Sequence, residues 1–339
     1  RKLWEQLLET RFRTGEPYLN FIDTANRYLP KPMKRKGLRI HGSNLCNEIH
    51  LPTNEERTAV CCLSSLNLEL YDEWKDTELV KDLITFLDNV LQFFIDNAPD
   101  YISRARYSAT QERSLGLGAM GLHSLYQKHN MPFDSLRART LNEEIFKKIK
   151  DDALEQTKIL GKERGEAPDM KGTGKRNAHL LAIAPNANSS MITGCSPSIE
   201  PHKANAYTHR TRAGSHLIKN KYLRQELIKL NMDTPEVWTS IITNGGSVQH
   251  LDFINDSIKE VFKTAIEINQ REIITQGGER QQYLCQGQSL NIFFPAGASK
   301  KYLHDVHMQA WKDECKGLYY LRTETSHRAE NVACLLYTS

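Results

Sequence analysis

The sequence predicts an α/β protein in which helices cover a sheet of short strands. Two patterns predict this class. Apolar residues recur at helix spacing in several long segments, and short, mostly apolar runs lie between them. The expected helices span 3–13, 79–97, 141–160, 258–269 and 303–311. The expected strands span 59–68, 179–184, 289–294 and 318–321.

Composition excludes several classes of protein. Hydrophobic residues make up 39% of the 339 residues and charged residues 25%, as in ordinary water-soluble proteins. The net charge is only +4 and the basic residues are scattered, so no nucleic acid is expected as a partner. No membrane is expected either, because no apolar run approaches membrane-spanning length. A cytoplasmic location follows. Because the sequence begins at Arg1 rather than methionine, we expect a fragment.

Seven cysteines occur without paired CxxC spacing, which favours reduced thiols or a redox site over zinc or a disulfide framework. Gly116, Gly118 and Gly121 have the spacing of a dinucleotide loop, but no buried strand is evident before them. We interpret them as glycines that allow close packing within a helical stretch. His304 and His307 are interpreted as surface residues of a helix rather than metal ligands.

Asn44, Cys46 and Glu48 occupy alternate positions in the run Gly-Ser-Asn-Leu-Cys-Asn-Glu-Ile. In an extended segment these three side chains would share one side. A thiol can give up a hydrogen atom, a carboxylate can take a proton, and an amide can orient a hydroxyl group. The run is therefore a candidate catalytic segment.

Two other pairs of residues are candidates. Cys61 and Cys62 lie in an expected strand, so only one of them can face Cys46, although both can equally be small buried residues. Tyr319 and Tyr320 would ordinarily be one core and one surface residue of a strand. A functional tyrosine pair needs both rings close together, which requires a departure from regular strand geometry.

The segment Pro185, Asn186, Ala187, Asn188 and Ser189 follows the expected strand 179–184. Small side chains allow backbone amides to approach an anion, and a following helix would add its positive N-terminal end. The segment is therefore a candidate phosphate site. A simple cap or turn explains the same residues, since Pro, Asn and Ser are common there.

Five motifs in this order resemble those of the catalytic subunit of class I ribonucleotide reductase. They are Ser-Asn-Leu-Cys-Asn-Glu-Ile (43–49), Cys-Cys-Leu-Ser-Ser-Leu-Asn (61–67), Ala-Pro-Asn-Ala-Asn-Ser (184–189), Ser-Pro-Ser-Ile-Glu-Pro (196–201) and Leu-Tyr-Tyr-Leu (318–321). The resemblance covers nearly the whole chain and weakens after Glu330.

The resemblance implies a ten-stranded α/β barrel made of two half-barrels, with a central finger loop carrying the radical cysteine. Residues 1–332 match the C-terminal half of this catalytic domain, with the finger loop at about 40–50, and 333–339 form an atypical or truncated tail. The upstream half and the regions that bind ATP and dNTP effectors would then be missing. We expect the isolated chain to be inactive and poorly stable, with an open barrel edge.

The resemblance also implies roles for the candidate residues. Cys46 matches the thiyl radical that abstracts the 3′ hydrogen of a ribonucleotide, Glu48 the base for the 3′-hydroxyl proton, and Asn44 the amide that holds the substrate hydroxyls. Cys61, rather than Cys62, matches one cysteine of the redox pair, whose partner lies upstream of Arg1.

Tyr319 and Tyr320 match the tyrosines that relay a radical to Cys46, and 185–189 matches the loop that binds the substrate diphosphate. The implied partners are a ribonucleoside diphosphate, a metal-containing small subunit that supplies the radical, thioredoxin or glutaredoxin, and a second large subunit. No cofactor or metal is expected in this chain itself.

Two other interpretations stay open. A cobalamin-dependent reductase would have a similar thiol and carboxylate loop, although the tyrosine pair has no role there. Alternatively, an inactive split half acts only as a binding partner. The intact Asn44, Cys46 and Glu48 argue against decay, because each can change without harm to a fold.

Overall fold

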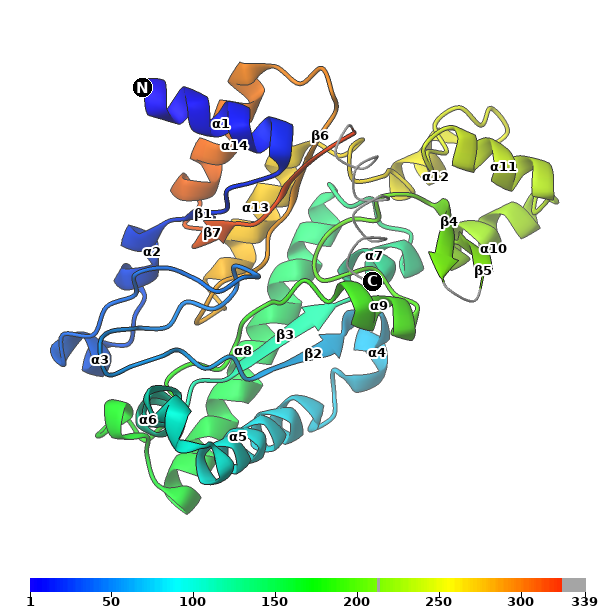
Figure 1. Cartoon of the computed structure of the whole chain (residues 1–339). Helices are drawn as coiled ribbons and strands as arrows, with labels where there is room; N and C mark the ends of the chain where they lie inside the picture. The colour runs from blue at the N-terminus through cyan, green and yellow to red at the C-terminus, as the bar shows by residue number, and fades with distance from the viewer. Residues whose placement is uncertain (212–213, 325–339) are drawn as a thin grey trace.

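The computed structural model describes residues 1–211 and 214–324 (Figure 1), so the expected tail at 333–339 lies outside the described part. Its α-helices are α1 (Lys2–Thr14), α2 (Ile22–Arg27), α3 (Lys31–Arg35), α4 (Tyr71–Trp74), α5 (Leu79–Asn97), α6 (Ser103–Glu112), α7 (Leu122–Lys128), α8 (Leu136–Arg164), α9 (Ala187–Thr193), α10 (Lys221–Lys229), α11 (Pro235–Thr243), α12 (Asp256–Val261), α13 (Gln270–Gln281) and α14 (Lys300–Lys312). Its strands are β1 (Leu19–Asn20), β2 (Leu63–Asn67), β3 (Gly116–Met120), β4 (Ala206–Thr211), β5 (Gly214–Lys219), β6 (Ile292–Phe294), β7 (Gly317–Leu318) and β8 (Leu321–Thr323).

Parallel pairings run across the molecule in chain order. β2 pairs with β3, Leu117 of β3 pairs with Leu181, Ile183 pairs with Gln288, and β6 pairs with β8. Each crossover between neighbours contains helices, as parallel strands require. The expected strand 179–184 is extended but pairs only through isolated bridges at Leu181 and Ile183. The expected strand 289–294 is a regular strand only over β6.

The crossover helices α5, α8, α13 and α14 contact one another over the sheet (Figure 1). Their apolar positions recur at helix spacing, as with Val80, Ile84, Leu87 and Leu91 of α5, and these side chains enter the main core. The expected helices 3–13, 79–97, 141–160 and 303–311 are confirmed, some with longer bounds. The α/β class follows directly from this helical cover.

The helix expected over 258–269 is wrong beyond its first residues, since α12 ends at Val261. Phe262 belongs to a second core, whereas Ala265 and Ile268 belong to the main core. The apolar spacing in this segment therefore reflects a chain that crosses between two cores, not one face of a continuous helix.

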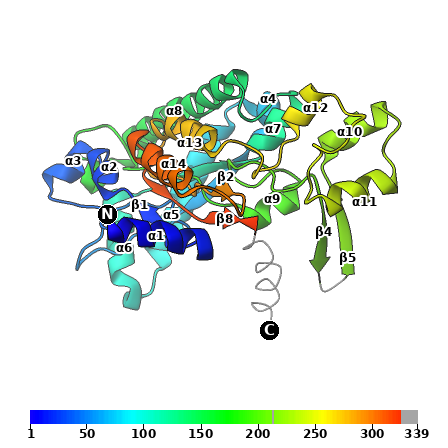
Figure 2. The same ribbon diagram turned by 90° about the horizontal axis from the view of Figure 1, so that it is seen from above.

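The second core lies under the β4–β5 hairpin, α10, α11 and α12, which together project from one side of the molecule (Figures 1 and 2). The fully buried Trp238 is at its centre. No helix in the described ranges is long and apolar enough to cross a membrane.

Gly116 and Gly118 lie in the buried strand β3, so the helical interpretation was wrong. A Cβ at Gly118 would lie 2.4 Å from the carbonyl oxygen of Ala182. Glycine is unfavourable in strands, but here the close approach of neighbouring backbones outweighs that propensity. Gly121 then begins α7 with a positive φ of 83°.

His307 is fully buried, so its interpretation as a surface residue was also wrong. Its Nε2 accepts a hydrogen bond from Arg11 Nε (3.1 Å), and its Nδ1 lies 2.7 Å from the carbonyl of Leu303. His304 is exposed and accepts a hydrogen bond from Trp4 (3.0 Å). The two histidines therefore join α14 to α1.

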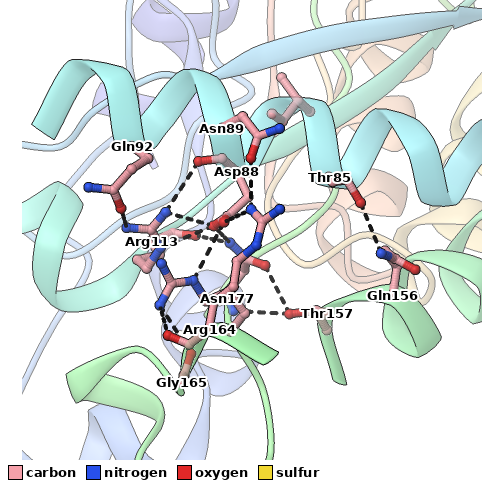
Figure 3. Close-up of polar contacts among 12 residues, drawn as sticks. Thr85, Asp88, Asn89, Gln92, Arg113, Gln156, Thr157, Arg164, Gly165 and Asn177 are labelled. Carbon is pink, nitrogen blue, oxygen red and sulfur yellow. Dashed lines mark hydrogen bonds and ion pairs between the residues drawn. The ribbon is translucent and has the colours of Figure 1, made fainter. Parts of the chain in front are cut away.

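Three arginines surround one buried carboxylate at the far end of the helical layer (Figure 3). Arg113 donates to Asp88 Oδ1 (2.8 Å), Arg164 donates to Oδ2 (3.0 Å), and Arg176 lies at 3.5 Å from Oδ2. Asn177 also donates to Oδ1 (3.0 Å). This cluster joins α5, the end of α6, the end of α8 and the following loop.

Replacement of Asp88 by Asn is expected to destabilise the fold by about 3 kcal/mol, because it leaves buried guanidinium groups without their counter-charge. Burial alone would raise the pKa of Asp88, but Arg113, Asn177 and Arg176 lower it below the ordinary 3.8. The stabilisation is therefore complete above the ordinary pKa and is lost as pH falls through the folded-state pKa.

Urea denaturation of the wild type and the Asp88→Asn variant between pH 3 and 7 checks this. The control is Asp82→Asn, an exposed position on the same helix, which we expect to change stability by less than about 0.5 kcal/mol. Equal stabilities of Asp88→Asn and wild type at pH 7 would contradict the assignment.

Candidate active site

The segment around Cys46 is a turn rather than the extended run that alternation predicted. The amide of Asn47 donates to the carbonyl of Asn44 (3.1 Å), and Asn47 has a positive φ of 65°. Leu45 at the tip is 82% exposed, whereas Glu48 is buried. The three candidate side chains are brought together by this turn and not by strand alternation.

Asn44 and Glu48 are joined by reciprocal hydrogen bonds. Asn44 Nδ2 donates to Glu48 Oε1 (3.0 Å), while Asn44 Oδ1 accepts from the amides of Glu48 and Ile49 (both 3.1 Å). One amide side chain thus closes the turn and orients the carboxylate.

Residues 287–289, which precede β6, hold the turn through hydrogen bonds. Ser289 Oγ hydrogen-bonds the carbonyl of Cys46 and lies 3.3 Å from Glu48 Oε2. The amide of Gly287 donates to the carbonyl of Glu48 (2.8 Å). Sequence reasoning missed Ser289, because serine at the start of a strand carries no distinctive local signal.

Desolvation in this site raises the pKa of its acidic groups. Burial raises the pKa of Glu48, against hydrogen bonds that lower it. Burial and then the Glu48 carboxylate raise the pKa of Cys46, while a side-chain hydrogen bond with Tyr319 acts in the opposite direction. Cys46 is therefore a neutral thiol at neutral pH, in contact with Tyr319.

Cys61 and Cys62 face opposite ways. Cys62 is buried, and its Sγ lies 3.6 Å from the carbonyl of Leu87 in the helical layer. Cys61 is exposed on the other side, near Glu48 and Cys46. Desolvation of its sulfur, followed by these two groups, raises the pKa of Cys61 to about 12.

The two tyrosines lie between β7 and β8, where regular pairing is interrupted. Their ring centroids are 4.3 Å apart, so the closeness required of a functional pair is present. A third ring was missed: Tyr18 lies 4.7 Å from the Tyr319 ring and 4.9 Å from the Tyr320 ring. Arg322 covers Tyr320, with its guanidinium carbon 4.4 Å from the ring centroid.

The candidate phosphate loop follows the edge of the sheet. Asn186 adopts a positive φ of 52°, and its side chain donates to the carbonyl of Ala119 (3.2 Å) and accepts from Ser65 (3.0 Å). These contacts fix the loop at the carboxyl ends of β2 and β3. Ala187, Asn188 and Ser189 are exposed at the start of α9, and Pro185 is half-buried.

No group of three or more His, Cys, Asp or Glu side chains suited to hold a metal ion occurs within residues 1–211 and 214–324. The site consists of thiols, one carboxylate, amides, hydroxyls and three aromatic rings. Such a set transfers hydrogen atoms and protons.

Comparison with known proteins agrees with this chemistry. The family model of the ribonucleotide reductase barrel domain matches residues 1–174 and 167–321. The chain therefore belongs to the ribonucleotide reductase family, and both the α/β fold class and the resemblance are confirmed.

Within this family the chain is similar to large, or alpha, subunits. It is 61% identical over 334 residues to the putative ribonucleoside-diphosphate reductase large subunit of Frog virus 3, covering 97% of this chain and 59% of that protein. It is 47% identical over 327 residues to the large subunit of Invertebrate iridescent virus 3, covering 95% of this chain and 52% of that protein.

A solved structure, the class Id ribonucleotide reductase alpha subunit of Actinobacillus ureae, superposes with a TM-score of 0.91 at 43% identity. The match covers 95% of this chain and 61% of that chain. The chain thus spans about half to three fifths of the length of these relatives.

Alkylation of the folded chain is expected to distinguish the adjacent thiols. The reactive species is the thiolate, and the raised pKa of Cys61 makes its reaction with iodoacetamide slow at pH 7 and about tenfold faster per pH unit up to pH 9. Cys62 should react only after unfolding, because its side chain is buried. Mass spectrometry of peptides after timed labelling measures both rates, and equal labelling of the two would contradict the assignment.

Asn47 tests the backbone of the turn. Asn47→Gly and Asn47→Ala remove similar side-chain contacts, but only alanine opposes a positive φ, so we expect Asn47→Ala to be less stable by about 1 kcal/mol. The matched pair at exposed Glu144 in α8 should show the opposite order, because glycine is unfavourable within a helix. Thermal unfolding of the four variants decides, and the same order at both sites would contradict the interpretation.

Proposed function

We propose that this chain supplies the radical-bearing part of the active site in the reduction of ribonucleoside diphosphates to 2′-deoxyribonucleoside diphosphates by a class I enzyme. The observation that carries the proposal is the contact of the Cys46 thiol with Tyr319, beside the hydrogen-bonded Glu48 and Asn44. The relatives reported above are named for this reaction.

Cys46 is assigned as the residue that abstracts the 3′ hydrogen. Oxidation of its S–H by a radical on Tyr319 moves one proton and one electron together and leaves a thiyl radical. A thiol that stays protonated suits this step, since a hydrogen atom cannot be given up by a thiolate. The raised pKa of Cys46 supports the assignment.

Glu48 and Asn44 are assigned to the ribose. Once the 3′ carbon is a radical, Glu48 takes the 3′-hydroxyl proton, and the 2′-hydroxyl leaves as water after gaining a proton. The raised pKa of Glu48 favours retention of a proton taken up in this way. Asn44 holds the carboxylate in place and can hydrogen-bond the hydroxyl groups of the substrate.

Cys61 is assigned as one of the two cysteines that supply the electrons. The two thiols become a disulfide while the 2′ carbon gains hydrogen, and Cys46 then returns a hydrogen atom to the 3′ carbon. The placement of Cys61 beside Cys46 and Glu48 supports this role. The second cysteine is proposed to lie in a part of the enzyme upstream of this chain.

The loop 185–189 is proposed to bind the substrate diphosphate through backbone amides, with the exposed Ser189 as a further donor. Tyr320 and Tyr319 are proposed to relay the radical from a metal-containing small subunit. The proposal also includes thioredoxin or glutaredoxin as the reductant and a dimer of large subunits. It places the effector sites outside this chain and the enzyme in the cytoplasm. Residues 1–332 are assigned to the C-terminal half of the catalytic barrel.

The close tyrosine pair favours this class over a cobalamin-dependent reductase, which has no use for such a relay. The two enzymes are distinguished by their radical source. Turnover that requires a small subunit supports the first, and turnover with adenosylcobalamin alone supports the second.

The test uses a chimera in which this chain is joined to the part of the Frog virus 3 large subunit that lies outside the matched region. With the viral small subunit and dithiothreitol, we expect deoxycytidine diphosphate to form from cytidine diphosphate. Cys46→Ser and Tyr319→Phe should each lower turnover by about 10⁴-fold or more, because each removes the transferable hydrogen atom.

Cys285→Ser is the matched control, because it changes a half-buried thiol that has no assigned role. We expect its turnover to stay within about twofold of the parent chimera. Normal turnover of Cys46→Ser would overturn the radical assignment. The chain without the added part is expected to form no deoxynucleotide.

A further inference from the structure

We propose that Tyr18 is a positioning residue for the Tyr319–Tyr320 pair: its ring holds the two rings together, and its hydroxyl holds their hydroxyl protons during radical transfer. This inference rests on the proposed function, because it concerns the relay to Cys46. Tyr18 itself is not oxidised in the transfer.

The three rings form a closed group. Tyr18 meets Tyr319 with ring planes at 50° and Tyr320 with planes at 90°, and the pair itself is inclined at 51°. Every centroid lies within 4.9 Å of the other two. Edge and tilted contacts of this kind stabilise aromatic groups, so the pair is held from the side by a ring from a distant part of the chain.

The hydroxyl groups are close as well. The hydroxyls of Tyr320 and Tyr319 lie near enough to the Tyr18 hydroxyl for both to affect its pKa. A phenol hydroxyl both donates and accepts, so one group can serve two neighbours. Desolvation, followed by the hydrogen bond to Tyr320, raises the pKa of Tyr18, and the phenol keeps its proton at neutral pH.

The backbone around Tyr18 is fixed relative to the pair. Buried Arg11 donates to the carbonyl of Pro17, which precedes Tyr18, and to the carbonyl of Tyr319 (3.2 Å). On the other side of Tyr18, Leu19 of β1 pairs with Leu318 of β7. The Tyr18 ring therefore has a set position beside the relay.

The chemistry explains why a fixed hydroxyl is needed. A radical on Tyr320 takes one electron and one proton from Tyr319, and the radical on Tyr319 then takes one electron and one proton from the Cys46 thiol. Proton transfer depends steeply on the distance between donor and acceptor atoms. The Cys46 thiol interacts with Tyr319, so this sequence passes through Tyr320, Tyr319 and Cys46, with Tyr18 beside it.

The first test measures the proton of Tyr319 without any turnover. 2,3,5-Trifluorotyrosine is placed at position 319 of the chain, and its ¹⁹F resonances are followed against pH. The trifluorinated ring ionises while Tyr18 is still a neutral phenol, so the Tyr18 hydroxyl acts on it only as a hydrogen-bond donor to the phenolate. Tyr18→Phe removes this donor and is therefore expected to raise the apparent pKa at position 319 by at least about 0.5 unit, while Tyr101→Phe, at an 87% exposed position, leaves it unchanged.

The second test uses the active chimera with its small subunit. Tyr18→Phe keeps the ring and removes the hydroxyl, and we expect kcat to fall about tenfold with unchanged KM. Tyr101→Phe is again the control. 2,3,5-Trifluorotyrosine at position 18 keeps the shape and acidifies the hydroxyl, so it should make kcat depend on pH where the parent does not, even if Tyr18→Phe folds poorly.

An unchanged titration at position 319, or an unchanged kcat for both Tyr18 variants, would overturn the role of Tyr18. A parent chimera that forms no deoxynucleotide would overturn the proposed function instead. The two failures are therefore distinguishable.

Discussion

The arrangement of the site depends on one buried cation. Arg11 is fully buried, and its guanidinium donates to His307, to the Pro17 carbonyl and to the Tyr319 carbonyl. Burial lowers the pKa of Arg11 to about 10 and that of His307 to about 3, so the arginine stays charged and the histidine is a neutral acceptor. A buried guanidinium is tolerated only when its N–H groups donate hydrogen bonds. The fold is therefore stable only with these three acceptors in place.

The same physical condition, removal from water, gives the thiols and the carboxylate their character. In water a cysteine tends towards the thiolate as pH rises, and a carboxyl group is ionised at neutral pH. Here desolvation raises the pKa of Cys46 and of the buried Glu48, and also that of Cys61 although its side chain is exposed. The site thereby favours transfer of hydrogen atoms over nucleophilic attack, which needs a thiolate.

The sequence predicted most long helices because amphipathic spacing is set by packing on one core, as in α5. It failed where packing was not local. The apolar residues of 258–269 pack in two different cores rather than on one helix face. The glycines of β3 are required by the close approach of a neighbouring backbone, which no local pattern predicts. Motif order predicted Asn44, Cys46, Glu48 and the tyrosine pair as site residues. Ser289 and Tyr18 carry no local pattern, and only the fold brings them to the site.

The contacts that complete the site join residues very far apart in the chain. The Arg11 to Tyr319 hydrogen bond spans 308 residues, and the Ser289 to Glu48 contact spans 241. Contacts at such separations form late, because a long loop must be closed before they are gained. During synthesis Cys46 emerges well before the support and relay that surround it. On the proposed mechanism, a half-made chain carries the thiol but has no route by which a radical reaches it.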